Sequence, residues 1–461
     1  MSKQGFAPNE LGTEDIGKLL KKYALPAIVA MTASSLYNMV DSIFIGHGIG
    51  SLAISALAVT FPFMNLSAAL GTLVGVGAST MISVLLGQKN YDVANKVLAN
   101  IVSLNIIIGF LFMGISLYFL DEILSFFGAS VNTLPYAREY MKIILYGNVI
   151  NHIYFALNAV MRSSGHPKKA MYLTIFTVVI NTVLDPIFIF VFDWGISGAA
   201  WATVFSQTLA LIVVLHHFSD KSRALHFKKG IRLDLRIAKD SMAIGMGPFL
   251  MNSAASIVTL FINQQIRAYS GDLGIGAYGI NNRITFMFMM ICMGLNHGMQ
   301  PISGYNYGAK KYSRVKEVYK KTVFYATIVS TICFIVSVFL PELAVSIFTH
   351  DETLKEIAAK GLRAMNIIFP VVGFQMISTN LFQSLGMVKK SVTLSLSRQI
   401  LFLIPSLYFL PKFFGAKGVW LSFPVSDFLA LILTIIMLSN LIKKLNTLKD
   451  GDDPKILGSN L

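Results

Sequence analysis

The stretch LGQKNYDVANKV at residues 86–97 recurs further along the chain as YGAKKYSRVKEV at residues 307–318. Matched Gly, Lys, Tyr and Val residues share one constant offset. Two more blocks repeat in the same order: RSSGHPKKA at 162–170 with QSLGMVKKS at 383–391, and, one residue out of step, GISGAAWATVFSQTLAL at 195–211 with GAKGVWLSFPVSDFLAL at 415–431. Blocks that recur in order and spacing predict a chain built from two similar halves.

The composition places both halves in a membrane. The chain has 461 residues, of which 54% are hydrophobic and 13% are charged, whereas a soluble domain carries about 25% charged residues. Apolar runs recur at the length of a helix that crosses a bilayer, roughly 20 residues. We predict twelve spans: 24–45, 58–86, 95–119, 136–160, 168–192, 197–218, 243–268, 279–303, 319–340, 362–382, 391–410 and 418–440. The first run is too long for a signal-peptide core, so we expect it to be retained.

The basic residues indicate how these spans are oriented. The net charge of +15 comes from Lys and Arg that gather in alternate connections, as at 21–22, 168–169, 219–240, 310–311, 389–390 and 443–444. The opposite connections, such as GHGIGSLA at 46–53 and DWGIS at 193–197, are nearly free of them. This asymmetry predicts cytoplasmic termini in a multi-pass protein of the cell (inner or plasma) membrane. The charge therefore predicts contact with membrane lipids, and no nucleic acid is implied.

Six spans in each half return the chain to its starting side, so the halves should share one orientation. We therefore predict an all-α polytopic membrane protein with two six-helix lobes, related by a pseudo-two-fold axis along the membrane normal. The expected parts are an N-lobe at 1–218, a cytoplasmic linker at 219–241, a C-lobe at 242–440 and a cytoplasmic tail at 441–461. The two cysteines, Cys292 and Cys333, both fall inside spans, so no disulfide or metal site is expected.

Two carboxylates interrupt the apolar spans of the first half. Asp41 lies in SLYNMVDSIFIG at 35–46, and Asp185 lies in VVINTVLDPIFIF at 178–190. An Asp at the centre of a transmembrane helix costs roughly 2.5–3.5 kcal/mol on insertion scales. Asn181 precedes Asp185 by four residues, which places both on one helix face. Pro186 has no N–H, so it frees the carbonyl one turn earlier.

Depth along the helices places these polar residues in one layer. At a rise of 1.5 Å per residue, Asp41 and Asp185 each lie about 25 Å above the cytoplasmic end of their span. Thr203 lies roughly 9 Å below the opposite surface on the sixth span. Two carboxylates at one depth without a nearby basic residue predict a Na⁺ site or a shared proton. The alternative is a structural role in capping or joining helices.

The second half has no equivalent pair. The repeat aligns Asp41 with Asn263, an amide, so both carboxylates belong to the first half alone. Asp427 in the twelfth span is a weaker candidate, with Arg398 in the eleventh span as its expected partner. A structural ion pair and a functional role both stay open for these two residues.

These motifs together resemble the MATE (multidrug and toxic compound extrusion) family over essentially the whole chain. The resemblance rests on LPAIVAMTASSLYNMVDSIFIG at 25–46, GVGASTMISVLLGQKN at 75–90, RSSGHPKKA at 162–170 and NTVLDPIFIF at 181–190. Its prokaryotic DinF-like branch implies an N-lobe ion site made by Asp41, Asn181, Asp185, Thr203 and the backbone of Ala199. The resemblance also implies that Tyr37 joins this network, that Asn158 faces the substrate, and that the first helix bends at Pro26.

The resemblance implies a multidrug efflux antiporter rather than an enzyme. Such a protein would export organic cationic amphipathic compounds in exchange for Na⁺ or H⁺ by alternating access, as a monomer and without any cofactor beyond the coupling ion. One alternative is a lipid-linked oligosaccharide flippase, which would favour cationic residues in its cavity; the main one here is Arg398. Another is a membrane-embedded transferase, which would require an Asp- or His-rich cluster at a membrane face.

Overall fold

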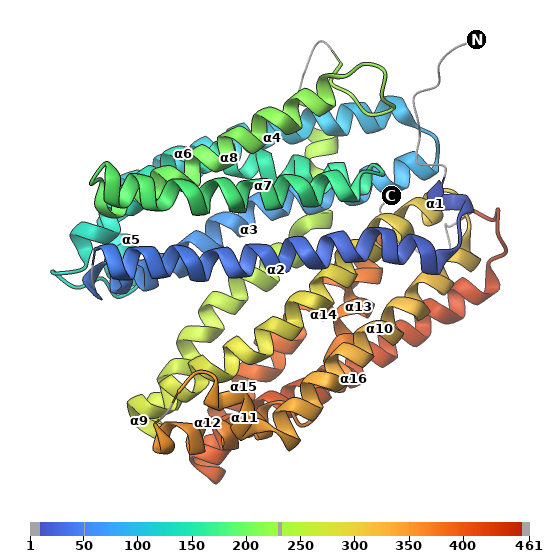
Figure 1. The fold of residues 1–461 in the computed structure, drawn as a ribbon. Coiled ribbons are helices and arrows are strands. Elements are labelled where there is room, and N and C mark those ends of the chain that lie inside the picture. The colour runs from blue at the N-terminus through green and yellow to red at the C-terminus, as the bar shows by residue number, and fades with distance from the viewer. Residues whose placement is uncertain (1–9, 50, 229–232, 350, 454–461) are drawn as a thin grey trace. The chain divides into compact units, whose positions relative to one another are not determined.

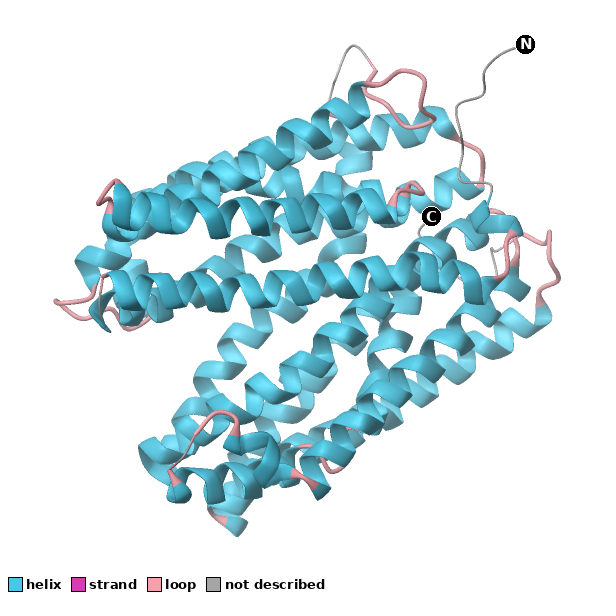
Figure 2. Cartoon of the chain, viewed as in Figure 1, coloured by secondary structure: helices cyan, strands magenta, loops and turns pink. Residues whose placement is uncertain are grey.

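The computed structural model describes residues 10–49, 51–228, 233–349 and 351–453, and these ranges are helical, with no strand among them (Figures 1 and 2). The first half of the chain forms α1 (Glu10–Thr13), α2 (Ile16–Gly48), α3 (Ser51–Gly87), α4 (Tyr91–Tyr118), α5 (Leu120–Phe126), α6 (Leu134–Ser163), α7 (Pro167–Pro186), the π-helix η1 (Ile187–Val191) and α8 (Gly195–Ser219). The second half forms α9 (Leu235–Gly308), α10 (Tyr312–Phe339), α11 (Pro341–Ser346), α12 (Glu352–Met365), α13 (Pro370–Ser384), α14 (Val388–Leu396), the π-helix η2 (Ser397–Leu403), α15 (Ile404–Phe414) and α16 (Ala416–Thr447).

The helices account for the predicted membrane spans. Among the described residues, nine helices are long and apolar enough to cross a membrane, and α12 with α13 forms a tenth span that is bent by 54°. Two further stretches of similar length are α2 and the part of α9 that follows Gly271, where the backbone leaves the helical conformation at φ 64°. The prediction of an all-α protein with twelve transmembrane helices in two lobes is confirmed.

The chain forms two compact units whose border does not follow chain order alone. One unit contains Val29–Phe249 and the described residues before Asp15, and the other contains Asp15–Ile28 and the chain from Leu250. The sequence placed the border in a linker at 219–241 and all of α2 in the N-lobe. Residues 229–232 of that linker, and 454–461 of the expected tail at 441–461, lie outside the described residues, and the tail begins inside α16.

Close packing explains why the start of α2 belongs to the second unit. A Cβ atom added at Gly298 of α9 would lie 2.6 Å from the Cα atom of Ala24, and one at Gly294 would lie 2.7 Å from that of Ile28. Two glycines four residues apart therefore let the α2 backbone lie directly on α9. Small residues at this spacing are what holds helices together in lipid, where apolar surfaces gain nothing by leaving the solvent.

The backbone repeats as the sequence does. Lys89 and Lys310, which match in the first repeated block, both adopt left-handed conformations, with φ of 58° and 56°. Such values are uncommon for residues other than glycine, so their recurrence shows that both turns are built alike. The other two blocks show the same agreement at Gly165 and Gly386, with φ of 97° and 70°, and at Gly195 and Gly415, with φ of 53° and 58°.

The two halves differ in how they cap the helix after the first of these turns. Asn90 caps α4 through its side chain, which accepts a hydrogen bond from the backbone N–H of Val93 at 3.3 Å. Lys311 occupies the matching position before α10 and has no acceptor to offer. The carboxylate of Asp450, from the segment after α16, accepts instead from the backbone N–H of Ser313 at 2.9 Å and from its hydroxyl at 2.5 Å.

Replacing Asp450 by Ala should loosen the first turn of α10. Loss of a helix cap costs about 1 kcal/mol. Partial burial opposes ionisation, yet the hydrogen bonds from Ser313 hold the pKa of Asp450 below its usual value. Ionised Asp450 therefore stabilises the first turn of α10 above about pH 4. This stabilisation is lost as the pH falls through the lowered pKa of Asp450. Amide hydrogen exchange in the first turn of α10 measures both effects.

Asn90→Ala is the matched control for this experiment. It should loosen α4 by a similar amount, with no dependence on the ionisation of Asp450. Equal protection of the first turn of α10 in the wild type and in Asp450→Ala would contradict the assignment of this cap.

Candidate functional site

Asp41 of α2 and Asp185 of α7 lie together inside the first unit. Their carboxyl groups are within hydrogen-bonding contact of each other, and the two residues are 7% and 0% exposed. Oδ1 of Asp41 is buried without a hydrogen-bond partner among the described residues. Two carboxyl groups in contact in a buried place cannot both stay ionised unless a cation lies between them; otherwise they share a proton.

Asn181 and Thr203 complete this polar group. Asn181 is 1% exposed and Thr203 is 8% exposed. In one orientation of the Asn181 amide, its nitrogen donates to Thr203 Oγ1 at 3.3 Å and its oxygen faces Asp185. In the reversed orientation the nitrogen donates to Asp185 Oδ2 at 2.9 Å, and the oxygen accepts from the Thr203 backbone N–H at 3.1 Å. The group thus joins α2, α7 and α8, and we name these four residues the carboxylate cluster.

A local change of helix type positions the cluster. Because Pro186 has no backbone N–H to donate, α7 ends there and the chain continues as the wider helix η1, in which Phe192 N–H bonds to Ile187 O at 2.9 Å. Gly198 of α8 packs on this helix, since a Cβ atom there would lie 2.8 Å from the carbonyl oxygen of Phe188. The close approach holds α8 against the end of α7, and Ala199 beside it is fully buried.

Two other residues implicated by the family resemblance, Asn158 and Pro26, lie elsewhere. Asn158 is buried on α6 and donates to the carbonyl of Ala170 at 3.2 Å, roughly 22 Å from Asp185 along the rise of α7. The structure therefore does not bring Asn158 into the carboxylate cluster. Pro26 lies within α2, also roughly 22 Å from Asp41 along that helix. The side chain of Tyr37 lies outside the described part of the chain.

A second polar group in the first unit was not predicted. His152 of α6 is fully buried, and its Nε2 lies 2.8 Å from the carbonyl oxygen of Ser67 on α3. The hydroxyl of Ser67 donates to Asn148 Oδ1 at 2.5 Å. Asn148 and His152 are four residues apart on one helix face, and this spacing was the signal available in the sequence. Their contacts join α3 to α6.

The second unit holds its buried carboxylate differently. Arg398 of η2 donates from Nε to Asp427 Oδ1 at 2.5 Å, and Asp427 is 2% exposed. The predicted partnership of these residues is confirmed. Both line a cavity of about 200 Å³ together with Asn366, whose amide donates to Ser337 Oγ at 3.0 Å. Asp427 therefore has a counter-charge, whereas the described residues include none beside Asp41 and Asp185.

Comparisons with known proteins agree with this architecture. The family model MatE matches residues 26–187 and again 244–409, one match in each half. Multidrug export protein MepA of Staphylococcus haemolyticus is 28% identical over 431 residues, covering 93% of this chain and 95% of its own. MepA of Staphylococcus aureus is 28% identical over 421 residues, covering 91% and 93%. A solved structure of an outward-facing multidrug resistance MATE family transporter superposes with a TM-score of 0.89 at 23% identity, covering 96% of this chain and 99% of its own.

Gly198→Ala tests the packing that positions the cluster. The new methyl group would meet the backbone of Phe188, so the two helices must separate, at a cost of about 1–3 kcal/mol. We expect a lower melting temperature of the purified protein in detergent. The control is Gly114→Ala near the end of α4, where a Cβ atom meets nothing within 4 Å; it should raise stability by up to about 1 kcal/mol. Equal melting temperatures for the two variants would refute the tight contact.

Proposed function

Because this chain belongs to the MatE family, we propose that it is a multidrug efflux antiporter, which exports organic cationic amphipathic compounds in exchange for Na⁺ or H⁺ by alternating access. The observation that carries the proposal is the contact between Asp41 and Asp185. Both are buried, and no Lys, Arg or His is among their partners in the described residues. Carboxylates that lack a fixed counter-charge suit a site whose positive charge comes and goes.

The carboxylate cluster can serve either coupling ion. With its oxygen toward Asp185, Asn181 adds a third oxygen ligand to the two carboxylates. The hydroxyl of Thr203 and the backbone of Ala199 could then supply more oxygen atoms, as Na⁺ requires. With the amide reversed, the nitrogen donates to Asp185, and a proton shared by the carboxyl groups removes the remaining repulsion. The two amide orientations thus correspond to the two proposed ions.

Competition for this negative charge supplies the coupling. A cationic substrate and the coupling ion both gain from the carboxylates, so binding of one weakens binding of the other. Pro26 is the proposed bending point of α2, and the border between the two units crosses α2 two residues later. A change at Asp41 can therefore be transmitted along one helix that contributes residues to both units.

The proposed setting is a cell membrane with both chain ends on the cytoplasmic side, where the Lys and Arg residues gather. The S. haemolyticus and S. aureus relatives are named multidrug export proteins, which supports small drug-like substrates. Two paired lobes in one chain make a monomer sufficient. The uncompensated carboxylates favour a cationic substrate over the pyrophosphate of a lipid-linked oligosaccharide.

Asp41→Asn and Asp185→Asn should each reduce export of a cationic dye at least tenfold, because each removes the charge for which ion and substrate compete. The measurement is dye efflux from cells at matched expression. Asp121→Asn is the control, since Asp121 pairs with Arg138 at an exposed site, 2.6 Å apart, and should leave efflux unchanged. Near wild-type efflux by both Asp41→Asn and Asp185→Asn would contradict the proposal.

Thr203→Val identifies the ion. If Na⁺ binds in the carboxylate cluster, loss of the hydroxyl removes one ligand of the ion. The Na⁺ concentration for half-maximal transport should then rise several-fold, as the free energy of one polar contact to a charged group implies. Transport by purified protein in liposomes, under separately imposed Na⁺ and pH gradients, measures this effect. Thr208→Val is the control, because its hydroxyl only donates to Val204 O within α8. A protein driven by the pH gradient alone, and indifferent to Thr203→Val, would exclude the Na⁺ form of the proposal.

A further inference from the structure

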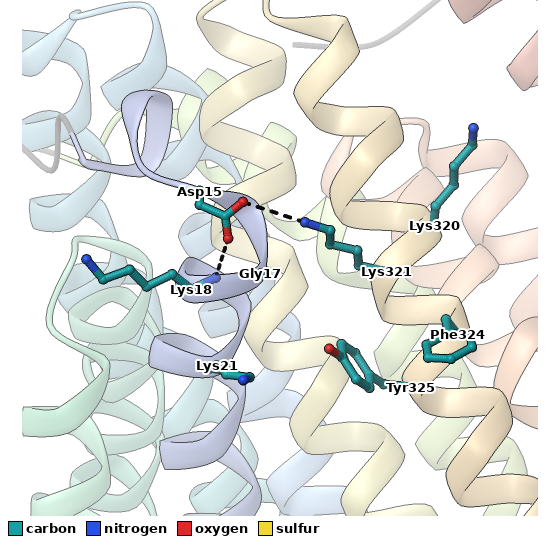
Figure 3. Close-up of a pocket in the computed structure, with 8 residues that line it drawn as sticks. All are labelled: Asp15, Gly17, Lys18, Lys21, Lys320, Lys321, Phe324 and Tyr325. Carbon is teal, nitrogen blue, oxygen red and sulfur yellow. Dashed lines mark hydrogen bonds and ion pairs between the residues drawn. The ribbon is translucent and has the colours of Figure 1, made fainter.

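A basic cavity lies at one end of the second unit, between the start of α2 and the first turns of α10 (Figure 3). Its volume is about 560 Å³. Lys18 and Lys21 line it from α2, and Lys320 and Lys321 line it from α10. All four residues belong to one compact unit, so the cavity is internal to that unit. We name it the lysine cavity.

Most of this positive charge is not neutralised. Asp15 is the acidic residue of the lining; its carboxylate accepts from the backbone N–H of Lys18 at 2.9 Å and lies 3.7 Å from Lys321 Nζ. Lys321 is paired a second time, with Glu317 at 2.8 Å. Within the described residues, Lys18, Lys21 and Lys320 have no ion pair. The lining therefore carries four lysines and one carboxylate, and an anion would be attracted to it, although the Lys18 and Lys320 ammonium groups point outward from the space between α2 and α10 (Figure 3).

An apolar surface lies one helical turn beyond the lysines. Phe324 and Tyr325, which are 63% and 37% exposed, each follow a lysine of α10 by four residues. On α2, Leu25 is 57% exposed and follows Lys21 by the same interval. Residues four apart lie on one helix face, so Lys21, Lys320 and Lys321 are each followed on their helix face by an exposed apolar side chain, whereas Lys18 is followed by Lys22. Phe324 and Tyr325 lie on α10, a candidate membrane span, one turn further from its start than Lys320 and Lys321.

The fold itself does not require the lysines. In the repeat, Lys320 and Lys321 match Ala99 and Asn100 of α4, which are 8% and 3% exposed. Asn100 is used inside the first unit, where its side chain accepts from the backbone N–H of Asp234 at 2.8 Å. The same helix position is thus buried and uncharged in one half and open and cationic in the other. This difference between matched positions suggests that the lysines of the second half bind a ligand rather than support the fold.

We propose that the lysine cavity binds the phosphate of an anionic glycerophospholipid, with an acyl chain lying along Leu25, Phe324 and Tyr325. This inference rests on the proposed orientation, in which the lysines lie at the cytoplasmic surface. Basic pockets at the ends of transmembrane helices suit anionic headgroups, and aromatic side chains one turn deeper lie at the level of the membrane interface. A free phosphate ion would contact the lysines but would gain no binding energy from Leu25, Phe324 and Tyr325.

The test measures lipid binding by the purified full-length chain, using native mass spectrometry with added phosphatidylglycerol. The triple variant K18Q/K21Q/K320Q removes the unpaired charges and leaves the Asp15–Lys321 contact in place. At about fivefold per lysine, the affinity of the first bound lipid should fall roughly hundredfold. Asp15→Asn should act in the opposite direction, because it removes the negative charge while Asn still caps α2. Phosphatidylcholine should bind equally weakly to all variants.

A matched control separates a site from general surface charge. K389Q/K443Q removes two exposed lysines outside the lysine cavity and should leave phosphatidylglycerol affinity within about twofold of the wild type. Equal weakening by both sets of variants would overturn the proposal, as would displacement of the lipid by excess inorganic phosphate. Phe324→Ala should weaken lipid binding while leaving any phosphate binding unchanged. None of these measurements involves transport. Lipid binding can therefore be confirmed or refuted whether or not the antiport proposal holds.

Discussion

Two buried carboxyl groups in contact, with no Lys, Arg or His among their partners in the described residues, are the constraint on which the rest of this structure depends. Asp41 and Asp185 touch inside a membrane protein, where each charge is costly and their repulsion is weakly screened. The second unit resolves the same problem permanently, with Arg398 against Asp427. Under the proposed function, the partner of Asp41 and Asp185 is exchangeable, and the preferred state of the first lobe would depend on what is bound. The asymmetry between two similar halves therefore lies in their electrostatics more than in their backbones.

Backbone-to-backbone contacts hold the helices that carry these groups. Apolar side chains gain little from mutual burial in lipid, so close packing at small residues has to supply the stability. Gly294 and Gly298 allow α9 to receive α2, and Gly198 allows α8 to receive η1. Each contact adjoins an element that the proposed mechanism uses. The glycine contact that stabilises the packing of α8 therefore also positions Thr203 of α8 against Asn181 of α7.

Much of the fold could be predicted from the sequence, because repeats, apolar run length and charge asymmetry are properties of the chain itself. Depth counting placed Asp41, Asn181, Asp185 and Thr203 in one layer, and the structure shows them in contact. The side of α2 on which its first turns pack could not be predicted, because that depends on glycines about 270 residues away. The hydrogen bond from Asn158 to Ala170 O could not be predicted for a related reason: a family motif carries a residue's position, but not its hydrogen-bond partner.

The cap on α10 has a consequence for how the protein is made. In the first half, the turn before α4 and its capping Asn90 are adjacent in the chain, so α4 can complete its first turn as soon as it is synthesised. In the second half, the carboxylate that caps α10 belongs to Asp450 and is synthesised only after α16. Domains fold largely in the order of synthesis. The first turn of α10 therefore receives its capping carboxylate only after α16 has been synthesised, whereas α4 carries its cap from the start.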